Sequence, residues 1–483
     1  MRSTEICHQA TCEIRLRRRE GRLRKYAFAL ISFPLFFTLG EGRLAADEVT
    51  KWNEIAGRAA FASGLHDNPL FTSRVYAMTH AAVHDALNAI DRRYRPYVLD
   101  RPVTPGASSE AAVVAAAHHV LVNQYSLLTA FGFPSQQPIL DAAYDSSLAL
   151  IPDGPAKTAG LEVGNSAATA ILALRAHDGW NTKTVLDFNF PQGTAPGEYR
   201  FTPPFNFAFL PAWGTLPPFV LNKSSQFRPG PPYKINSRRY TEDFNEVKSL
   251  GGDGQTTLSA RTADQTQIAL FWLESSPLGW NRIARTVSVA RGLDLWENGR
   301  LFGLLNLALA DGYIAVFDAK YHYNYWRPIT AIREADTDGN PDTVGDPNWR
   351  SLVDAPAVPD YDSGHAVQGG AAAQVLLRFF DTDNIAFTTC STTIPAGRTC
   401  NDASPAWRFF TSFSDAAEEN GLSRILIGFH FRKAVTEGIE HGRKIANYAF
   451  NHFLRPAHGA PVKPVSIDPV GRTTTSRPAP ATQ

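Results

Sequence analysis

A short polar turn followed by an apolar helix lies in the C-terminal third of the chain. The turn (residues 359–365) has the sequence PDYDSGH, and an apolar run over residues 371–380 follows it. A helix that begins here leaves unpaired backbone N–H groups and the positive end of its dipole, and Ser363 is expected to cap its first turn. Gly364 lets an anion approach the backbone closely, and His365 would face that anion as a proton donor or acceptor. The turn therefore predicts an anion site.

A pair of cations precedes this turn in the chain. Lys320 and Arg327 are seven residues apart, close to two full turns of an α-helix, so we expect them to project from one helix face about 20° apart. Pro328 disfavours helical backbone at the residue before it and is expected to end this helix at Arg327. The segment thus predicts two cationic side chains near one helix end.

A third cation and a second histidine follow the turn. Arg424 and His430 would lie roughly 120° apart on one continuous helix, so they reach a common ligand only if the chain breaks between them. Gly428 is the expected break, with Arg424 on a short helix and His430 near the start of the next. Fixed cations, a hydroxyl and backbone N–H groups describe a site for a tetrahedral oxyanion, and two histidines add a nucleophile and a general acid–base. The candidate set is Lys320, Arg327, Ser363, Gly364, His365, Arg424 and His430.

In this order, Lys-x6-Arg-Pro, Ser-Gly-His and Ser-Arg-x5-His resemble the motifs of the type 2 phosphatidic acid phosphatase and vanadium-dependent haloperoxidase superfamily. The neighbouring Trp326-Arg-Pro, the Gly369-Gly370 pair and residues 412–417 are most similar to its bacterial haloperoxidase-like branch. The resemblance implies an all-α fold of helical bundles, with two four-helix-bundle-like halves joined by a long loop rich in Pro, Gly and aromatic residues.

The resemblance also implies roles for the candidate residues. His430 would bond the central atom of the anion, His365 would transfer protons, and Lys320 would polarise bound peroxide. The oxyanion would be held by Lys320, Arg327, Ser363, Gly364 and Arg424. A haloperoxidase would hold vanadate as its cofactor and act on hydrogen peroxide and halide. A soluble acid phosphatase would instead bind phosphate and hydrolyse phosphate esters through a phosphohistidine at His430.

Two positions depart from the family pattern. The family places Asp four residues after the last histidine, where it orients the imidazole, and this chain has Ala434 there. Glu437 lies two turns along the helix, and a main-chain carbonyl is an alternative partner. The family commonly has Pro before Ser-Gly-His; here Asp362 would oppose anion binding unless it points outward or pairs with a cation such as Arg327. Three functions therefore stay open: a vanadate-dependent haloperoxidase, an acid phosphatase, and a non-catalytic anion-binding protein.

The N-terminus has the features of an export signal. Residues 1–46 combine a basic stretch, an apolar run over residues 27–39 and small residues before Asp47. An uncleaved membrane anchor and a misplaced start codon are the alternatives. The apolar run is too short to cross a bilayer, and no integral membrane span is expected in the mature chain. In an exported protein Cys390 and Cys400 are expected to form a disulfide, the alternative being two free thiols.

Composition and patterning define the remaining expectations. The formal net charge of +1 gives no general attraction to nucleic acid, and the oligomeric state stays open. His80 and His84 are predicted to be packed or solvated rather than metal ligands, and residues 336–342 to be a turn rather than a calcium loop. The long loop over residues 180–260 either lines the mouth of the site or straps the bundle. The predicted parts are a signal (1–46), an N-terminal helical region with the long loop (47–260), a C-terminal domain carrying the site (261–455) and a disordered tail (456–483).

Overall fold

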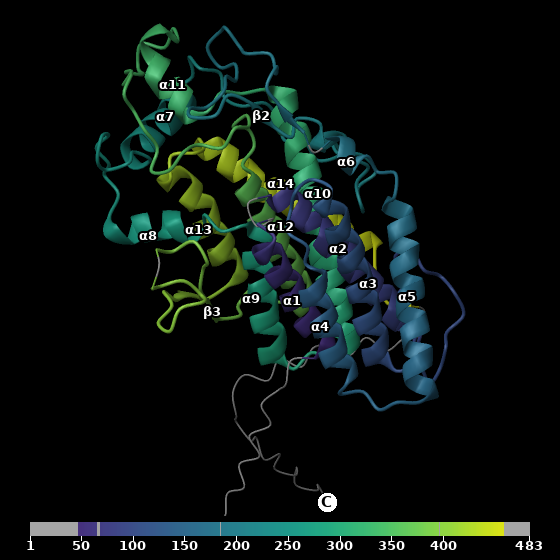
Figure 1. The fold of residues 1–483 in the computed structure, drawn as a ribbon. Helices are drawn as coiled ribbons and strands as arrows, with labels where there is room; N and C mark the ends of the chain where they lie inside the picture. Colours follow the sequence, from purple (N-terminus) through teal and green to yellow (C-terminus); the bar gives the residue numbers. More distant parts are fainter. Residues whose placement is uncertain (1–46, 65–67, 184, 396, 458–483) are drawn as a thin grey trace, which may run out of the picture. The chain divides into compact units, whose positions relative to one another are not determined.

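Helices form most of the structure, a computed structural model that describes residues 47–64, 68–183, 185–395 and 397–457 (Figure 1). The α-helices are α1 (Glu48–Ala62), α2 (Pro69–Asn88), α3 (Ser109–Thr129), α4 (Gln137–Leu148), α5 (Pro155–Arg175), α6 (Trp180–Lys183), α7 (Arg238–Leu250), α8 (Ala263–Phe271), α9 (Ser276–Arg291), α10 (Leu295–Tyr323), α11 (Pro328–Glu334), α12 (Gly364–Phe380), α13 (Phe413–Leu426) and α14 (Arg432–His452). Two antiparallel strand pairs accompany them: β1 (Leu186–Asp187) with β2 (Ala208–Phe209), and β3 (Phe387–Thr389) with β4 (Arg408–Phe410). The predicted all-α fold class is confirmed.

Polar capping residues determine where the helices begin. Asp47, Asn68 and Ser108 each accept a hydrogen bond from the backbone N–H three residues further on, at the starts of α1, α2 and α3. Asp294 and Glu297 form a reciprocal capping box at the start of α10. The predicted helical character of the N-terminal region is borne out by α1 to α5.

The helices pack in two groups that meet along α10. Helices α2, α3 and α5 pack on one another, α2 also packs against α10, and α10 in turn contacts α12 and α14. The closest approach joins α12 and α14, where a Cβ on Gly442 would lie 2.0 Å from the Val367 carbonyl oxygen and one on Gly370 would lie 2.1 Å from that of Ile439. These glycines bring the start of α12, with its Ser-Gly-His turn, beside the start of α14. The predicted boundary at residue 260 stays a prediction.

Among the described residues, two helices are long and apolar enough to cross a membrane by length and composition alone. These are α3 and α10, in which 67% and 94% of the most apolar 18-residue window is buried inside the fold. Length and hydropathy alone do not separate a core helix from a spanning one. Extensive burial within the protein accounts for the apolar character of α10.

The segment over residues 180–260, here called the strap, is not a continuous loop as predicted. It contains α6, β1, β2 and the thirteen-residue helix α7. In α7 the apolar residues Tyr240, Phe244 and Val247 recur at helical spacing and are buried, and Ser237 caps the first turn. The Pro- and Gly-rich sequence on both sides of this short amphipathic pattern concealed it.

Buried carboxylates anchor two extended segments to the helices. Asp311 on α10 accepts hydrogen bonds of 2.6–2.8 Å from the backbone N–H groups of residues 219–221 in the strap. Asp85 on α2 does the same for residues 97–99. Three N–H donors satisfy most of the bonding capacity of each carboxylate. The strap is therefore tied into the core, as the packing alternative expects.

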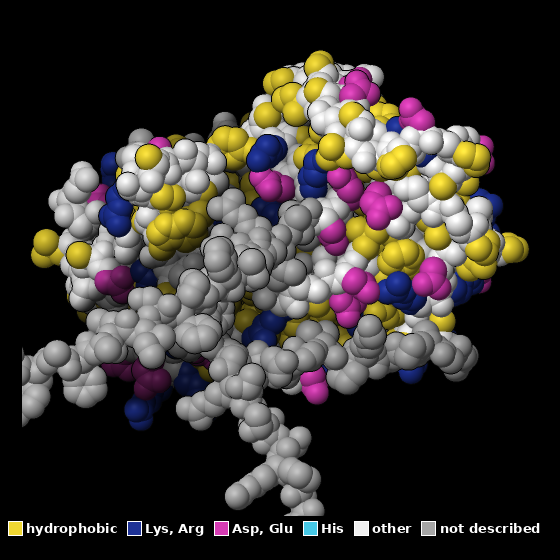
Figure 2. Space-filling view, turned by 90° about the horizontal axis from the view of Figure 1, so that it is seen from below, with side chains coloured by type: hydrophobic (Ala, Val, Ile, Leu, Met, Phe, Trp, Pro, Cys, Tyr) yellow, Lys and Arg dark blue, Asp and Glu magenta, His cyan; other side chains and the backbone are white. Residues whose placement is uncertain are grey.

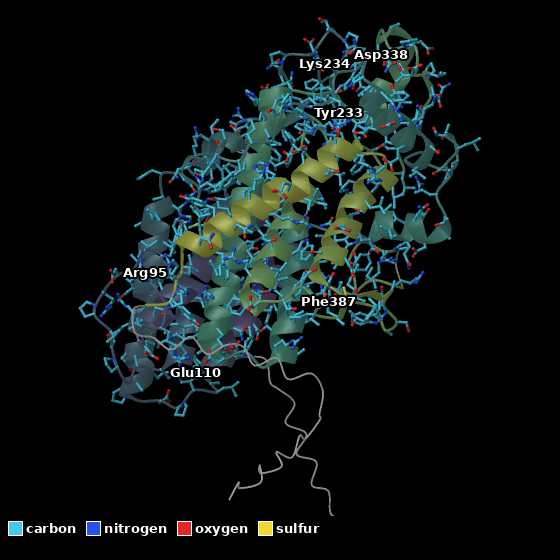
Figure 3. All side chains as sticks on the ribbon, turned by 180° about the vertical axis from the view of Figure 1, so that it is seen from behind. Arg95, Glu110, Tyr233, Lys234, Asp338 and Phe387 are labelled. Atoms are coloured by element: carbon cyan, nitrogen blue, oxygen red, sulfur yellow. A yellow bond between two sulfur atoms is a disulfide. The ribbon has the colours of Figure 1, made fainter. Side chains whose placement is uncertain are left out.

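One strand and one helix lead from the disulfide region to the break at Gly428. Arg408 to Phe410 form β4, and α13 runs unbroken from Phe413 to Leu426. Along β4 the residues alternate, with Phe410 buried beside Phe387 of β3, and with Trp407 and Phe409 exposed. This alternation with a period of two is typical of a strand with one buried face. Figure 3, which views the molecule from behind, labels Phe387 of β3 below α13.

The two candidate metal motifs hold protein contacts instead. His80 and His84 are fully buried; the His80 ring contacts the Asn53 side-chain amide at 2.8 Å, and His84 contacts a backbone carbonyl at 3.1 Å. Asp336 and Asp338 accept backbone N–H groups of their own loop. Across the described ranges no group of three or more His, Cys, Asp or Glu side chains is arranged to hold a metal ion. The packed-histidine and turn predictions are confirmed.

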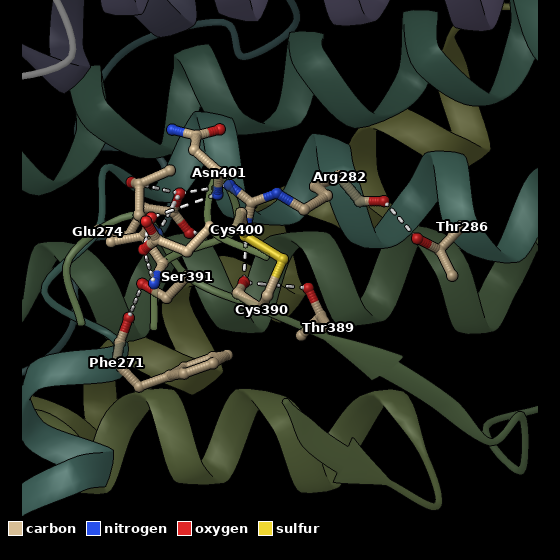
Figure 4. Close-up of a disulfide and its surroundings, with 12 residues drawn as sticks. Phe271, Glu274, Arg282, Thr286, Thr389, Cys390, Ser391, Cys400 and Asn401 are labelled. Carbon is tan, nitrogen blue, oxygen red and sulfur yellow. Dashed lines mark hydrogen bonds and ion pairs between the residues drawn. A yellow bond between two sulfur atoms is a disulfide. The ribbon is translucent and has the colours of Figure 1, made fainter. Parts of the chain in front are cut away.

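Cys390 and Cys400 form the predicted disulfide (Figure 4). The predicted export signal, with Cys7 and Cys12, lies outside the described residues, as does the predicted tail from residue 458 onward.

Charges of both signs are mixed on the described surface. On the face seen in Figure 2, acidic and basic side chains are interspersed, and neither sign forms a continuous patch. Exposed charges also pair across elements, for example Arg93 with Asp294. Such pairs on a protein surface contribute little to stability.

Candidate active site

Lys320 and Arg327 come from two helices rather than one. Helix α10 ends at Tyr323 because Asn324 adopts a left-handed conformation with φ 46°, a conformation that Asn tolerates better than most residues. Pro328 then begins α11 instead of ending α10, since proline is well suited to the first position of a helix. The prediction of one shared helix face is wrong, but both cations still project from helix ends and are buried.

The Ser-Gly-His turn opens α12 as predicted. Ser363 occupies the N-cap position, but its hydroxyl makes no capping hydrogen bond, and its backbone N–H donates to the Ala434 carbonyl at 3.0 Å. The His365 Nε2 atom lies 3.2 Å from the Glu274 carbonyl oxygen. Gly364 and His365 keep partial solvent exposure, whereas Ser363 is buried. The capping role expected for the hydroxyl is thus not taken, and the hydroxyl is available to a ligand.

Arg424 and His430 flank the predicted break. Arg424 lies near the end of α13, Gly428 follows with φ 86°, and His430 stands two residues before α14 begins at Arg432. The backbone N–H groups of Phe429 and His430 both donate to the Arg424 carbonyl, at 3.0 and 3.2 Å. The expected break at Gly428 is confirmed. Arg424 lies on a fourteen-residue helix rather than a short one, and His430 lies just before α14 rather than on it.

The two outer motifs meet at one pocket. The Arg327 Nη1 atom lies 3.1 Å from His430 Nε2 and donates to the Phe429 carbonyl at 2.9 Å. Lys320 donates to the carbonyls of Pro359 and Asp360, both at 2.9 Å, in the loop that leads to Ser363. Burial lowers the pKa of His430 well below its ordinary value, and the nearby positive charges lower it further. These effects disfavour the charged form of the His430 imidazole.

The cations in this pocket are held in a poorly solvated environment. Burial lowers the pKa of Lys320 well below its ordinary value, with Arg327 lowering it further against the opposing effect of two Asp side chains. Burial lowers the pKa of Arg424 to about 9, and Arg327 contributes to the same shift. Burial and the nearby Arg424 also lower the pKa of His365. Buried cations that repel one another favour the binding of an anion.

Several polar atoms of the pocket have no hydrogen-bond partner among the described residues. They include the Ser363 hydroxyl, the Arg424 Nε and Nη2 atoms, His430 Nδ1 and both carboxyl oxygens of Asp360, while Arg424 Nη1 donates to the Trp272 carbonyl at 2.9 Å. Buried donors are normally satisfied, so unsatisfied ones beside buried cations indicate a ligand with several acceptor oxygens. Vanadate and phosphate both fit this donor set. Fold and site together describe a helical-bundle protein in which buried cations and unsatisfied polar atoms gather around His430.

The structure adds Asp360, which the sequence interpretation missed. Its Oδ1 atom lies 2.8 Å from His430 Nδ1, and neither side chain is more than 6% exposed. No local pattern marks this residue, because its partner lies seventy positions further along the chain. Asp362, expected to point outward or to pair with a cation such as Arg327, instead contacts His441 Nδ1 at 3.0 Å. Glu437 is paired with Lys433 and therefore does not orient His430.

Comparison with known proteins identifies the kind of helical bundle. Residues 300–459 match the family model described as the VCPO second helical-bundle domain. The chain is 25% identical over 478 aligned residues to vanadium chloroperoxidase from Curvularia inaequalis, covering 75% of this chain and 74% of that protein. This chain is thus similar in sequence to a vanadium chloroperoxidase, and the resemblance expected from its motifs is confirmed.

Solved structures share the fold. A bacterial vanadium-dependent iodoperoxidase matches with a TM-score of 0.68 and 24% identity, covering 84% of this chain and 97% of that one. A holo-type bacterial vanadium-dependent chloroperoxidase matches with a TM-score of 0.63 and 18% identity, covering 85% and 98%. At these identities the likeness establishes the helical fold alone.

Proposed function

We propose that this protein is a vanadate-dependent haloperoxidase that oxidises a halide with hydrogen peroxide at the pocket around His430. The observation that carries the proposal is the contact between Arg327 Nη1 and His430 Nε2, inside a buried group of cations with unsatisfied donors. This contact supports a site in which an imidazole nitrogen and three cations surround one oxyanion. Homology to vanadium haloperoxidases supports vanadate as that oxyanion.

Each residue has a role that follows from its position. His430 offers Nε2 to the central atom, and Lys320, Arg327 and Arg424 neutralise the charge of the oxygens. The Ser363 hydroxyl and the N-terminus of α12 supply further hydrogen-bond donors. Bound vanadate supplies a Lewis-acid centre that activates peroxide towards halide.

His365 is the residue best placed to transfer protons. It keeps some solvent exposure and its Nε2 atom contacts a backbone carbonyl. Burial, with the nearby Arg424 and Lys320, lowers the pKa of His365 well below its ordinary value. A neutral imidazole can accept a proton from an incoming ligand and later return it.

We also propose that the protein is exported. The candidate signal over residues 1–46 and the disulfide between Cys390 and Cys400 support this, because structural disulfides persist mainly in oxidising compartments. Comparing the mass of the protein in cytoplasmic and exported fractions of an expressing cell would show removal of the signal.

One experiment separates the candidate functions. Purified protein is assayed for oxidation of iodide, bromide and chloride by hydrogen peroxide, with and without orthovanadate, and in parallel for hydrolysis of p-nitrophenyl phosphate. We expect halide oxidation that depends on vanadate and disappears in His430→Ala. His452→Ala, which removes an exposed histidine at the end of α14, should retain activity. Hydrolysis that vanadate inhibits, without halide oxidation, would instead identify an acid phosphatase.

A further inference from the structure

The residue that faces the far side of the His430 imidazole is an acid from a different motif than the family pattern suggests. Asp360 lies in the loop before α12, is fully buried, and places Oδ1 2.8 Å from His430 Nδ1. The two atoms form a close polar contact without the alignment of a hydrogen bond, as is common for catalytic pairs before a ligand binds. Ala434, where the family has its Asp, offers no polar side chain.

The opposite side of the ring fixes which nitrogen carries the proton. Arg327 Nη1 lies 3.1 Å from His430 Nε2, and a guanidinium group can only donate hydrogen bonds. Nε2 must therefore be the acceptor, and the single proton of the neutral ring stands on Nδ1. The Asp360 carboxyl group lies beside that nitrogen, 2.8 Å away, so both neighbours are compatible with the same tautomer.

The loop that carries Asp360 is held on both sides. The backbone N–H of Asp360 donates to the Tyr325 carbonyl at 2.9 Å, and the Asp360 carbonyl accepts from Lys320 Nζ at 2.9 Å. Lys320 also binds the preceding carbonyl of Pro359. Two residues further on, the Asp362–His441 contact fixes the end of the same loop. Asp360 is therefore held in position by the same residues that form the oxyanion pocket.

We propose that Asp360 is the positioning residue of this site: its carboxylate holds His430 in the Nδ1–H tautomer and so keeps the Nε2 lone pair directed at the central atom of the bound oxyanion. The carboxylate takes the place of the acid that the family pattern puts one helical turn after the histidine. This inference rests on the proposed function only in naming vanadate as the oxyanion. Phosphate binding would depend on the same tautomer.

The test measures binding and tautomer separately. Orthovanadate and inorganic phosphate are titrated calorimetrically into the wild-type protein, Asp360→Ala and Asp360→Asn. Losing the outer partner of a ligating histidine typically weakens binding by about 10- to 100-fold, which is the loss we expect for Asp360→Ala. Asp360→Asn keeps the size of the side chain and an acceptor oxygen, so it should lose less. Imidazole ¹⁵N shifts, assigned by comparison with His430→Ala, should show the Nδ1–H form in the wild type and a shift towards Nε2–H in Asp360→Ala.

A matched control removes a second buried carboxylate elsewhere. Asp85 is also buried and, like Asp360, has a pKa that burial raises, in this case to about 6. Asp85→Asn should lower the melting temperature without changing vanadate affinity. If Asp360→Ala does not fold, Asp360→Asn carries both measurements.

The outcomes are distinguishable. Unchanged vanadate affinity or an unchanged His430 tautomer in both Asp360 variants would overturn the inference, and so would an equal loss of affinity in Asp85→Asn. A wild-type protein that binds neither vanadate nor phosphate would overturn the proposed function instead. Tight anion binding without halide oxidation would remove the haloperoxidase proposal and leave the role of Asp360 standing.

Discussion

Replacing Arg424 with methionine should stabilise the protein and abolish anion binding at the same time. Arg424 is 1% exposed, its Nε and Nη2 atoms have no hydrogen-bond partner in the described structure, and burial lowers its pKa to about 9. Holding this cation therefore costs folding free energy unless an anion is bound. Arg424→Met keeps most of the length of the side chain and removes the charge.

The gain in folding stability and the loss of anion affinity can each be estimated. Replacing buried charged groups by apolar side chains of similar size is often stabilising, by about 1–4 kcal/mol. In a chain this long each kcal/mol moves Tm by no more than about 2 °C, so we expect a rise of up to about 8 °C in vanadate-free protein. Losing two charge-assisted hydrogen bonds to the oxyanion costs about 3–6 kcal/mol, or roughly a hundred- to ten-thousandfold in Kd.

Thermal melts with and without orthovanadate measure both effects. A ligand at 100 times its Kd stabilises the native state by about 2.7 kcal/mol, which gives the wild type a Tm increase of up to about 5 °C. This increase should be absent in Arg424→Met. Arg378→Met is the control, because Arg378 hydrogen-bonds Asn447 and Asn451 away from the pocket. The reasoning is refuted if Arg424→Met melts below the wild type without vanadate, or retains the vanadate-induced increase.

Three further predictions concern the surroundings of the pocket. Ser363→Ala should leave Tm nearly unchanged, because the hydroxyl caps nothing, yet weaken vanadate binding by about tenfold or more in calorimetry. Replacing Cys390 and Cys400 with serine should cost about 2–4 kcal/mol of stability in urea unfolding. It should also lower halide oxidation, and a variant as active and stable as the wild type would contradict this. Ala434→Asp should not raise vanadate affinity, because Asp360 already faces Nδ1; a tenfold gain would argue against the assignment of Asp360.

The prediction for the disulfide rests on its neighbours (Figure 4). Ser391 donates to the Phe271 carbonyl at 2.7 Å, and Thr392 donates to the Glu274 carboxylate at 2.7 Å. Residues 271–274, which these two hydrogen bonds hold, also supply the Trp272 carbonyl that accepts from Arg424 and the Glu274 carbonyl that contacts His365. Loosening the loop between the cysteines therefore loosens one wall of the pocket.

Much of the site could be predicted because its residues lie in short motifs with local meaning. Ser363 and Gly364 mark a helix start, and Gly428 marks a break, since these residue types have particular backbone preferences. The prediction of one helix over Lys320 and Arg327 failed because Pro328 is compatible with starting a helix as well as with ending one. A helix that ends before Pro328 and a helix that begins at Pro328 are both compatible with the local sequence, so the sequence alone does not distinguish them.

Asp360 could not be predicted for a different reason. Its function depends on a contact with His430 that crosses from the α12 loop to the α14 loop, and only the packing of those helices brings the two together. The strap shows the same limit: α7 occupies a short amphipathic stretch in Pro- and Gly-rich sequence, where local composition favoured a loop. In both cases tertiary packing outweighed the local signal.

Every candidate residue of the pocket lies at or within a few positions of a helix end. Lys320 and Arg424 stand near the C-terminal ends of α10 and α13, Ser363 begins α12, and Arg327 and His430 precede α11 and α14. Substitutions at such positions leave helix interiors, and the apolar contacts between them, intact; large-to-small changes in those interiors would cost about 2–5 kcal/mol each. The scaffold is therefore suited to directed evolution. Libraries confined to these positions should stay folded while the preference among oxyanions and substrates changes.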